Sequence, residues 1–439
     1  MVLLHGETVF PGTPAALLRG AEYFIYVYHA RRSVVRDPGL SMARPNTHRP
    51  NGSPAINSST GSASQYQTPR DLLTQAAKNV SSFHFKRALR LYKSALSQLD
   101  HLQPSEENRR LIIEALQSSA FLLLDEGKLK EAKENFQKAV QLSPDEGYEK
   151  YMYLAQISGG SEAVDLYRRG IEIIKRSLDA SMNHQCHCEK MTDDVDSSTK
   201  NKLKRALSNA YCAISELYTT DLCDEPEAES SCREAVQKAT EADESNPQAW
   251  FSAANMLTIK AQNDEARRAL EKCFSLYWPQ VEQVVSLLRS RENGNGDVAG
   301  HDEEVEELDL EEISGMPYEA HIQMVKMMIE LDMFERAAEI LEVMLEEDDE
   351  HAEVLYLLTV VGKKLWINSD PDHLRYYAEV TRELCANNGD VETVGEMEEL
   401  LATLPQNDSG REGEGDGDPE ISSSGEDEEE EEEEVMDTL

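Results

Sequence analysis

The sequence predicts an all-α fold in which helical hairpins stack one after another into a solenoid. The first observation is a helical pattern of large and small apolar residues that a turn at 125–127 divides in two and that Pro144 ends. The second is that the same spacing recurs along most of the chain. Because each hairpin touches only its neighbours, 439 residues need no single large core. In the hairpin that turns at 125–127, the pattern consists of Leu116, Ala120, Leu123, Ala132, Phe136 and Ala139.

This spacing is that of the tetratricopeptide repeat. Its helix A carries a large residue followed by a small one, and its helix B carries a small, a large and another small residue. Small residues at the helix crossings allow a close approach, and the large ones fill the space between layers. We therefore predict a tetratricopeptide-repeat superhelical solenoid over 68–404, with about seven helical hairpins and a capping helix at 391–404.

Two apolar marker residues at the repeat spacing justify each predicted hairpin; one lies on helix A and one on helix B, except in the fourth hairpin, where both lie on helix B. Gly159 and Gly160 supply the turn of the third hairpin, and the fourth has a longer helix A over about 202–218. In chain order the marker residues are Ala76 and Tyr92, Ala120 and Phe136, Ala155 and Tyr167, Val236 and Ala239, Ala254 and Leu270, Met328 and Leu341, and Leu358 and Tyr377.

Four segments lack an apolar helical face. Two of them, near 183–199 and 291–315, are predicted to be loops inserted between hairpins. Residues 1–67 are rich in Pro, Ser, Asn and Gly and predict a disordered leader, with a mitochondrial presequence as the alternative. Residues 405–439 predict an acidic disordered tail, because they hold too little apolar surface to offset the entropy of ordering.

The charge of the chain is strongly negative and unevenly distributed. The formal net charge is −41, and the segment 405–439 contains sixteen acidic residues against Arg411 alone. A second run, 297–312, has nine acidic residues and no basic one, which leaves −17 on the remainder. Such a field repels nucleic acid and anionic membranes and attracts basic polypeptides. No apolar run approaches the roughly 20 residues that cross a bilayer, so neither a membrane nor a nucleic acid is predicted as a partner.

The motifs of catalysis and cofactor binding are missing from the sequence. It contains no phosphate-binding loop, no G-x-G-x-x-G, no H-E-x-x-H and no combination of nucleophile, base and orienting group, so we predict neither an enzyme nor a cofactor. His184, Cys186, His187 and Cys188 are too close in sequence to surround a tetrahedral ion, and no metal site is predicted. Most of the seven cysteines fall at helical core positions, where they act as small hydrophobes typical of a reducing compartment.

Tetratricopeptide arrays bind extended peptides in a groove lined by their A helices. Carboxylates interleaved with aromatic rings at these positions suit lysine and arginine side chains, through ion pairs and cation–π contacts. The alternative is that the same residues only solvate an exposed face. The predicted groove residues are Glu114, Gln117, Phe121, Asp125, Glu149, Tyr153, Phe251, Asn255, Glu319, Glu330, Glu353 and Tyr356.

A second kind of tetratricopeptide site can be compared with this one. Co-chaperones that hold the acidic C-terminus of a heat-shock protein use a clamp of lysine and asparagine on their first three repeats. The matching positions here retain Lys150 as their only cation, so such a clamp is not predicted. These positions are Leu73, Ala77, Ser118, Glu146 and Lys150.

Two segments of the chain resemble the dedicated assembly chaperones of large-subunit ribosomal protein four. They are 147–160 (GYEKYMYLAQISGG) and 208–229, which contains SELYTTDLC at 215–223. The order of variable N-terminus, repeats and acidic extension is also similar. The resemblance implies a monomeric chaperone of the cytoplasm and nucleus that captures a newly made, basic ribosomal protein of the large subunit. It would hold the client's long basic internal loop in the groove and escort the client to the pre-ribosome.

Two other functions fit part of the sequence. Histone chaperones also combine these repeats with acidic interruptions, but there the acidic tract usually interrupts an early repeat, whereas here it lies between the fifth and sixth. A mitochondrial or scaffold adaptor would require cleavage of the leader. In the tail, Ser423 and Ser424 each precede an acidic residue by three positions, a spacing that suits an acid-directed kinase.

Overall fold

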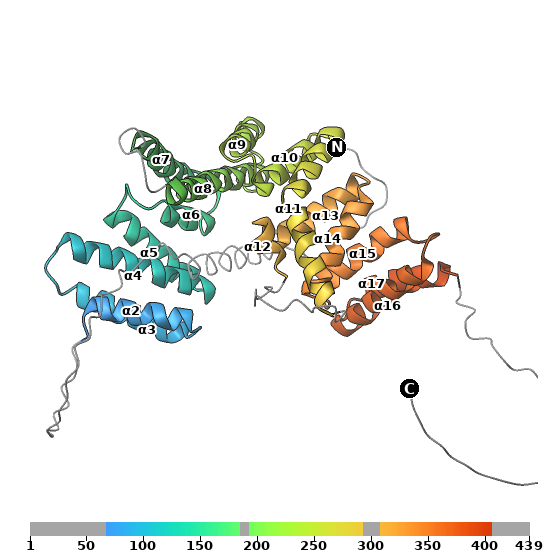
Figure 1. The fold of residues 1–439 in the computed structure, drawn as a ribbon, viewed down its shortest axis with the longest axis horizontal. Helices are drawn as coiled ribbons and strands as arrows, with labels where there is room; N and C mark the ends of the chain where they lie inside the picture. The colour runs from blue at the N-terminus through green and yellow to red at the C-terminus, as the bar shows by residue number, and fades with distance from the viewer. Residues whose placement is uncertain (1–66, 185–192, 293–307, 406–439) are drawn as a thin grey trace, which may run out of the picture. The chain divides into compact units, whose positions relative to one another are not determined.

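The computed structural model describes residues 67–184, 193–292 and 308–405, and in these ranges it contains sixteen α-helices and no strand (Figure 1). The predicted leader lies outside the described residues apart from residue 67, and the predicted tail lies outside them apart from residue 405. The helices are α2 (Pro69–Ser81), α3 (Phe85–Leu99), α4 (Glu106–Asp125), α5 (Leu129–Leu142), α6 (Glu149–Gln156), α7 (Gly160–His184), α8 (Asp193–Thr219), α9 (Ala228–Ala242), α10 (Pro247–Ile259), α11 (Asn263–Glu292), α12 (Leu310–Ser314), α13 (Tyr318–Glu330), α14 (Phe334–Glu347), α15 (Ala352–Leu365), α16 (Pro371–Asn388) and α17 (Val391–Thr403).

The helices pair as antiparallel hairpins, which confirms the predicted fold class. Six hairpins, α2/α3, α4/α5, α6/α7, α8/α9, α10/α11 and α13/α14, belong to a compact unit that ends at Leu365. A second unit begins at Trp366 and contains the hairpin α16/α17. The seventh hairpin differs from the predicted one. Its expected first helix, α15, belongs to the first unit and packs on α14, while α16 pairs with α17, the predicted capping helix.

Local sequence explains where the hairpins begin and turn. Thr68 caps α2 in a capping box: its hydroxyl accepts a hydrogen bond from the Asp71 backbone N–H, and the Asp71 carboxylate accepts one from the Thr68 N–H. The turn between α4 and α5 has Gly127 at φ +69°, a left-handed conformation that glycine adopts without steric cost. The predicted turn at 125–127 is confirmed.

Small residues bring the paired helices close together. Ala88, Ala132 and Phe136 are fully buried where neighbouring helices cross. At Gly170 on α7 a β-carbon would lie 2.1 Å from the Met152 Cε of α6 and 3.3 Å from the Tyr151 Cβ, so a larger residue here would force the Met152 side chain to move. The alternation of small and large residues in the sequence therefore reflects the distance between packed helices.

Both predicted loops are shorter in the structure than expected. Helix α8 begins at Asp193, inside the expected loop 183–199, and α12 occupies 310–314, inside the expected loop 291–315. Leu308, Leu310 and Met316 are buried, so this acidic stretch has an apolar face only about one turn long. A face that short gives no periodic signal in a sequence window.

Candidate binding face

We call the exposed side of the first helices of the six hairpins, α2, α4, α6, α8, α10 and α13, together with that of α15, the A-helix face. Among these helices, α2 packs on α4, α8 on α10, α10 on α13 and α13 on α15. All twelve predicted groove residues lie on α4, α6, α10, α13 or α15. None of the twelve is buried, so all of them are accessible to a ligand.

The structure brings Phe121 and Tyr153 together in an aromatic cluster on α4 and α6. Their ring centroids lie 4.5 Å apart at an interplanar angle of 72°. Both rings also contact buried Phe136 of α5, which stacks on Tyr153 at 5.8 Å and meets Phe121 edge-on at 5.4 Å. The two predicted groove rings are therefore fixed by the core and keep only part of their surface for a ligand.

Glu114 and Glu149 flank the aromatic cluster on the same two helices. Both residues are exposed by surface area, yet the protein atoms around each carboxyl raise its pKa. Arg70 opposes this rise at Glu114, and a backbone hydrogen bond and Lys150 oppose it at Glu149. An incoming cation would favour the charged form of either carboxyl.

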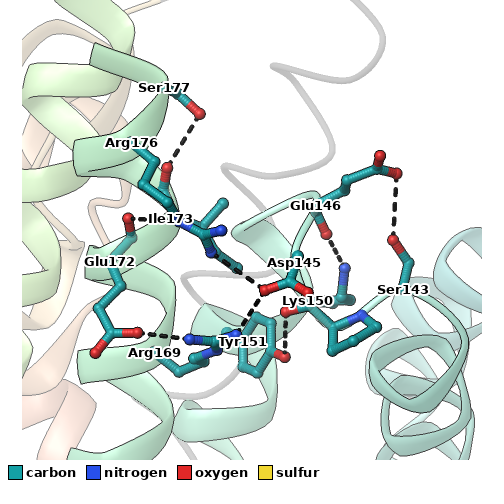
Figure 2. Close-up of polar contacts among 11 residues, drawn as sticks. Ser143, Asp145, Glu146, Lys150, Tyr151, Arg169, Glu172, Ile173, Arg176 and Ser177 are labelled. Atoms are coloured by element: carbon teal, nitrogen blue, oxygen red, sulfur yellow. Dashed lines mark hydrogen bonds and ion pairs between the residues drawn. The ribbon is translucent and has the colours of Figure 1, made fainter. Parts of the chain in front are cut away.

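Three cations on α6 and α7 contact other groups of this protein (Figure 2). Lys150 is 1% exposed and donates to the Glu146 carbonyl, and burial lowers its pKa. Arg169 and Arg176 of α7 approach the Asp145 carboxylate at 2.7 and 3.5 Å. Lys150, the cation left at the clamp positions, is thus buried and unavailable to an acidic peptide.

The same segment is tied down by its neighbours. The Tyr151 hydroxyl donates to the Pro144 carbonyl over 2.9 Å, and Arg169 also pairs with Glu172 at 2.6 Å (Figure 2). These contacts hold the link between α5 and α6 against α7. They therefore fix Glu149, the first residue of α6, relative to α4.

A second group of predicted residues meets on α13 and α15. Glu353 forms an ion pair with Lys326 at 2.6 Å, and Glu319 lies within electrostatic reach of Glu353. Burial raises the pKa of Glu319, and the Glu353 charge raises it further. Glu319 and Glu353 therefore repel each other while sharing one nearby lysine.

The structure adds three acidic residues that the sequence interpretation missed: Glu311, Glu347 and Asp348. Burial raises the pKa of Glu347 to about 7, and Glu311 contributes to the rise. The Glu347 carboxylate accepts a hydrogen bond from the Leu310 backbone N–H. The signal that could have revealed Glu347 and Asp348 is the acidic run 346–350, EEDDE, just before α15, and Glu311 lies in the acidic run 297–312.

Tyr318 connects these acids into what we call the carboxylate cluster: Glu311, Glu319, Glu347, Asp348 and Glu353. Its backbone N–H donates to Glu311 over 2.5 Å, and its ring lies 5.4 Å from that of His351. Burial and the charges of Asp348, Glu347, Glu319 and Glu353 raise the pKa of the Tyr318 hydroxyl. Four of the five acids thus act on one side chain.

The remaining predicted residues belong to neither cluster. Phe251 and Asn255 lie on α10, and Glu330 is the last residue of α13. Gln117 and Asp125 share α4 with the aromatic cluster, and Tyr356 shares α15 with Glu353. These six residues remain predicted contacts on the A-helix face.

Other chemical features of the described residues are few. They contain no group of three or more His, Cys, Asp and Glu arranged to hold a metal ion, and none of their helices has the length and hydropathy to cross a bilayer. The side chains of His184, Cys186, His187 and Cys188 fall outside the described part of the chain. Of the five described cysteines, Cys223 is exposed and the other four are buried, as the core positions predicted.

Comparison with known proteins agrees with this architecture. Residues 113–146 match the family described as the tetratricopeptide repeat. The solved structure titled "Assembly Chaperone of RpL4 (Acl4) (Residues 1-338)" matches with a TM-score of 0.53 and 23% sequence identity. The match covers 68% of this chain and 96% of that one, and it supports the fold.

Two curated relatives are similar in sequence. A protein of Schizosaccharomyces pombe named "Probable assembly chaperone of rpl4" is 31% identical over 249 residues, which is 54% of this chain and 61% of the relative. A protein of Emericella nidulans with the same name is 22% identical over 335 residues, 72% of each chain. The chain thus spans less than two thirds of the S. pombe relative's length. It is a tetratricopeptide-repeat solenoid that is similar to proteins named as assembly chaperones of rpl4, which confirms the resemblance seen in the sequence.

Proposed function

We propose that this protein is a client-specific chaperone that binds newly made rpl4, a basic ribosomal protein of the large subunit, shields it and escorts it to the pre-ribosome. The observation that carries the client's identity is the 31% identity with the S. pombe protein, whose name states that role. The A-helix face supplies the physical means. The twelve groove residues are the proposed contacts, and the aromatic and carboxylate clusters are their strongest parts.

The chemistry of the two clusters suits a cationic client. Ribosomal proteins carry extended basic segments that do not fold alone and that adhere to RNA. Burial raises the pKa of Glu114, Glu149 and Glu319, and a lysine or arginine placed beside these carboxyls would stabilise their charged form. Such contacts are screened by salt and give specificity and rapid association.

The acidic tail adds a second, local attraction for the same client. An anionic segment linked to the solenoid raises the effective concentration of carboxylates around a bound basic chain. Release onto the pre-ribosome follows because ribosomal RNA offers a denser negative charge and base-specific contacts. We propose that the protein works as a monomer in the cytoplasm and nucleus, without catalysis, cofactor, membrane or direct nucleic-acid contact.

A competition pull-down tests this function. The purified full-length chain is immobilised and offered equal amounts of recombinant rpl4 and core histones at moderate salt. Retention of rpl4 with little histone is expected. Retention of histones without rpl4 would reject the proposal in favour of the histone-chaperone alternative. Intact-mass measurement of the endogenous protein tests the adaptor alternative, which requires loss of the leader.

A further inference from the structure

A cleft lies on the second helices of two hairpins, α10/α11 and α13/α14. It has a volume of about 410 Å³ and is lined by residues of α11 and α14. This volume falls within the range of about 300–1,000 Å³ that is usual for ligand sites. Its lining residues are Trp278, Val281, Glu282, Val285, Ser286, Arg289, Glu339, Glu342 and Val343.

The floor of this α11–α14 cleft is apolar. Trp278, Val281 and Val285 come from successive turns of α11, and Val343 comes from α14. Trp278 is mostly buried and stacks on buried Phe274, with ring centroids 4.5 Å apart. The Trp278 indole N–H donates to Glu282 over 3.1 Å, which fixes the ring's orientation.

Two arginines span the gap between the helices. Arg336 of α14 lies 4.6 Å from the Phe274 ring centroid and 3.7 Å from the Glu271 carboxylate, both on α11. Arg289 of α11 reaches back to Glu346 of α14 at 2.6 Å. The two helices are therefore held apart at a fixed spacing, and the cleft between the bridges is part of the folded architecture.

The rim of the cleft is acidic. Glu282, Glu339 and Glu342 line it against Arg289, whose guanidinium pairs with Glu346 outside the lining. Arg336 shows how this surface holds a cation: its guanidinium lies over an aromatic ring while it pairs with Glu339 at 2.8 Å. An incoming arginine would meet carboxylates of the same kind farther along the rim, at Glu282 and Glu342.

From this geometry we infer that the α11–α14 cleft binds an arginine-bearing amphipathic segment of the basic client, separate from the segment held on the A-helix face. The inference rests on the proposed function. The apolar floor takes the aliphatic side chains of the segment and the acidic rim takes its cations. Two linked contacts give a total affinity above that of either contact alone, because the second forms at a high effective concentration.

The test compares two full-length variants that alter the cleft with a third variant that leaves the cleft unchanged. Ser286→Trp places a large side chain in the cleft from an exposed position, and Glu342→Lys reverses a rim charge without altering the floor. Gln283→Trp, also exposed on α11 but outside the lining, is the matched control. Thermal unfolding of all three confirms that they fold. The probes are recombinant rpl4 and a synthetic amphipathic peptide of leucine and arginine, both measured by calorimetric titration.

We expect Ser286→Trp to raise the Kd for rpl4 about tenfold and Glu342→Lys to raise it several-fold, which is the scale of one lost contact in a linked pair. Gln283→Trp should bind like the wild type, and the peptide should follow the same order. Unchanged binding of both probes by Ser286→Trp and Glu342→Lys would overturn the inference. Failure of the wild type to bind rpl4, with the peptide still bound, would instead overturn the proposed function. A concentration-dependent dimer that Ser286→Trp abolishes would assign the cleft to a second copy of the chain.

Discussion

The aromatic cluster and the carboxylate cluster lie on the same A-helix face but are built by opposite means. At the aromatic cluster, Phe121 and Tyr153 are anchored on buried Phe136, and the nearby cations are bound by the chain's own backbone and Asp145. At the carboxylate cluster, burial raises the pKa of Glu347 to about 7, and the charge of Glu311 adds to the rise. The first is a rigid apolar site with acids beside it. The second is a group of neighbouring acids whose charged forms an incoming cation would stabilise.

The comparison predicts different responses to salt and pH. Apolar and stacking contacts are little affected by ionic strength, whereas exposed charge pairs weaken beyond the Debye length of about 8–10 Å near physiological salt. Binding that depends on the aromatic cluster should therefore survive added salt better than binding that depends on the carboxylate cluster. The experiments that follow test this difference between the two clusters.

The largest expected effect comes from removing the anchor of the aromatic cluster. Phe136→Ala should destabilise its part of the solenoid by about 3–5 kcal/mol, because the substitution deletes a fully buried ring and leaves a cavity. Hydrogen exchange should show lost protection in α4–α6 and unchanged protection in α13–α15, since repeats interact only with neighbours. The exposed substitution Glu330→Ala is the control and should change stability by less than about 0.5 kcal/mol. Equal loss of protection at both clusters would contradict local anchoring.

Charge reversal compares the two clusters directly. Glu149→Lys and Glu319→Lys should each weaken rpl4 binding about 10- to 100-fold, the range of a lost charge pair of about 1–3 kcal/mol. In a salt series from 50 to 300 mM, the contact that remains in Glu149→Lys should be the more salt-sensitive one, because it relies on the carboxylate cluster. Identical salt slopes for both variants would show that the clusters do not differ in kind.

Lowering the pH should weaken binding through the carboxylate cluster. Glu347 has a pKa of about 7, so a growing share of this carboxyl is protonated as the pH falls from 7.5 to 6.0, and burial also raises the pKa of Glu319. The loss of charge should reduce rpl4 affinity several-fold, and binding should release protons. Calorimetry in buffers of different ionisation enthalpy measures that release. In Glu347→Gln the pH dependence should be smaller.

The stability of the protein should depend on Glu347 in the opposite direction. Because its pKa is about 7 when folded and about 4.5 when unfolded, the folded state binds more protons between these values. The stabilisation is complete below about pH 4.5 and is lost as the pH rises through about 7. Glu347→Gln, which keeps an acceptor for the Leu310 N–H, should therefore be more stable than wild type by about 1–2 kcal/mol at pH 8, after allowance for solvent screening. Thermal unfolding at pH 5 and pH 8 measures the difference; a variant that is less stable at pH 8 would contradict the assignment.

The smallest effect is expected from the acidic tail. Deleting residues 407–439 should weaken rpl4 binding a few-fold at low salt and have little effect at high salt, because a diffuse polyanion acts through screened attraction. Titrations at 50 and 300 mM salt test this. Complete loss of binding on deletion would move the main site from the A-helix face to the tail.

The sequence predicted the core positions that repeat with the helical period. It did not predict the loop boundaries or which helices pair in the folded chain. Ala88, Ala132 and Phe136 could be predicted as core because their spacing repeats in every hairpin. The loop boundaries could not be, since the apolar face of α12 is one turn long. The pairing of α16 with α17 was also missed, because periodicity marks a helix without naming its partner.

The residues of the candidate site were likewise predicted only in part from the sequence. Phe121 and Tyr153 were predicted on the correct helices, but their anchoring on Phe136 depends on the α4–α6 geometry. Glu347 was missed because it lies at the end of a second helix, outside the positions assigned to the groove. Lys150 carries a charge in the sequence, yet its burial and bond to the Glu146 carbonyl remove it from the ligand surface.

Site-specific photo-crosslinking tests most directly whether the A-helix face holds the client. A photoreactive amino acid replaces Gln117 on α4, Tyr356 on α15 or, as a control, exposed Gln137 on the second helix α5. After irradiation with bound rpl4, we predict crosslinked client from positions 117 and 356 and none from 137. Crosslinks from Gln137 with none from Gln117 and Tyr356 would contradict the account.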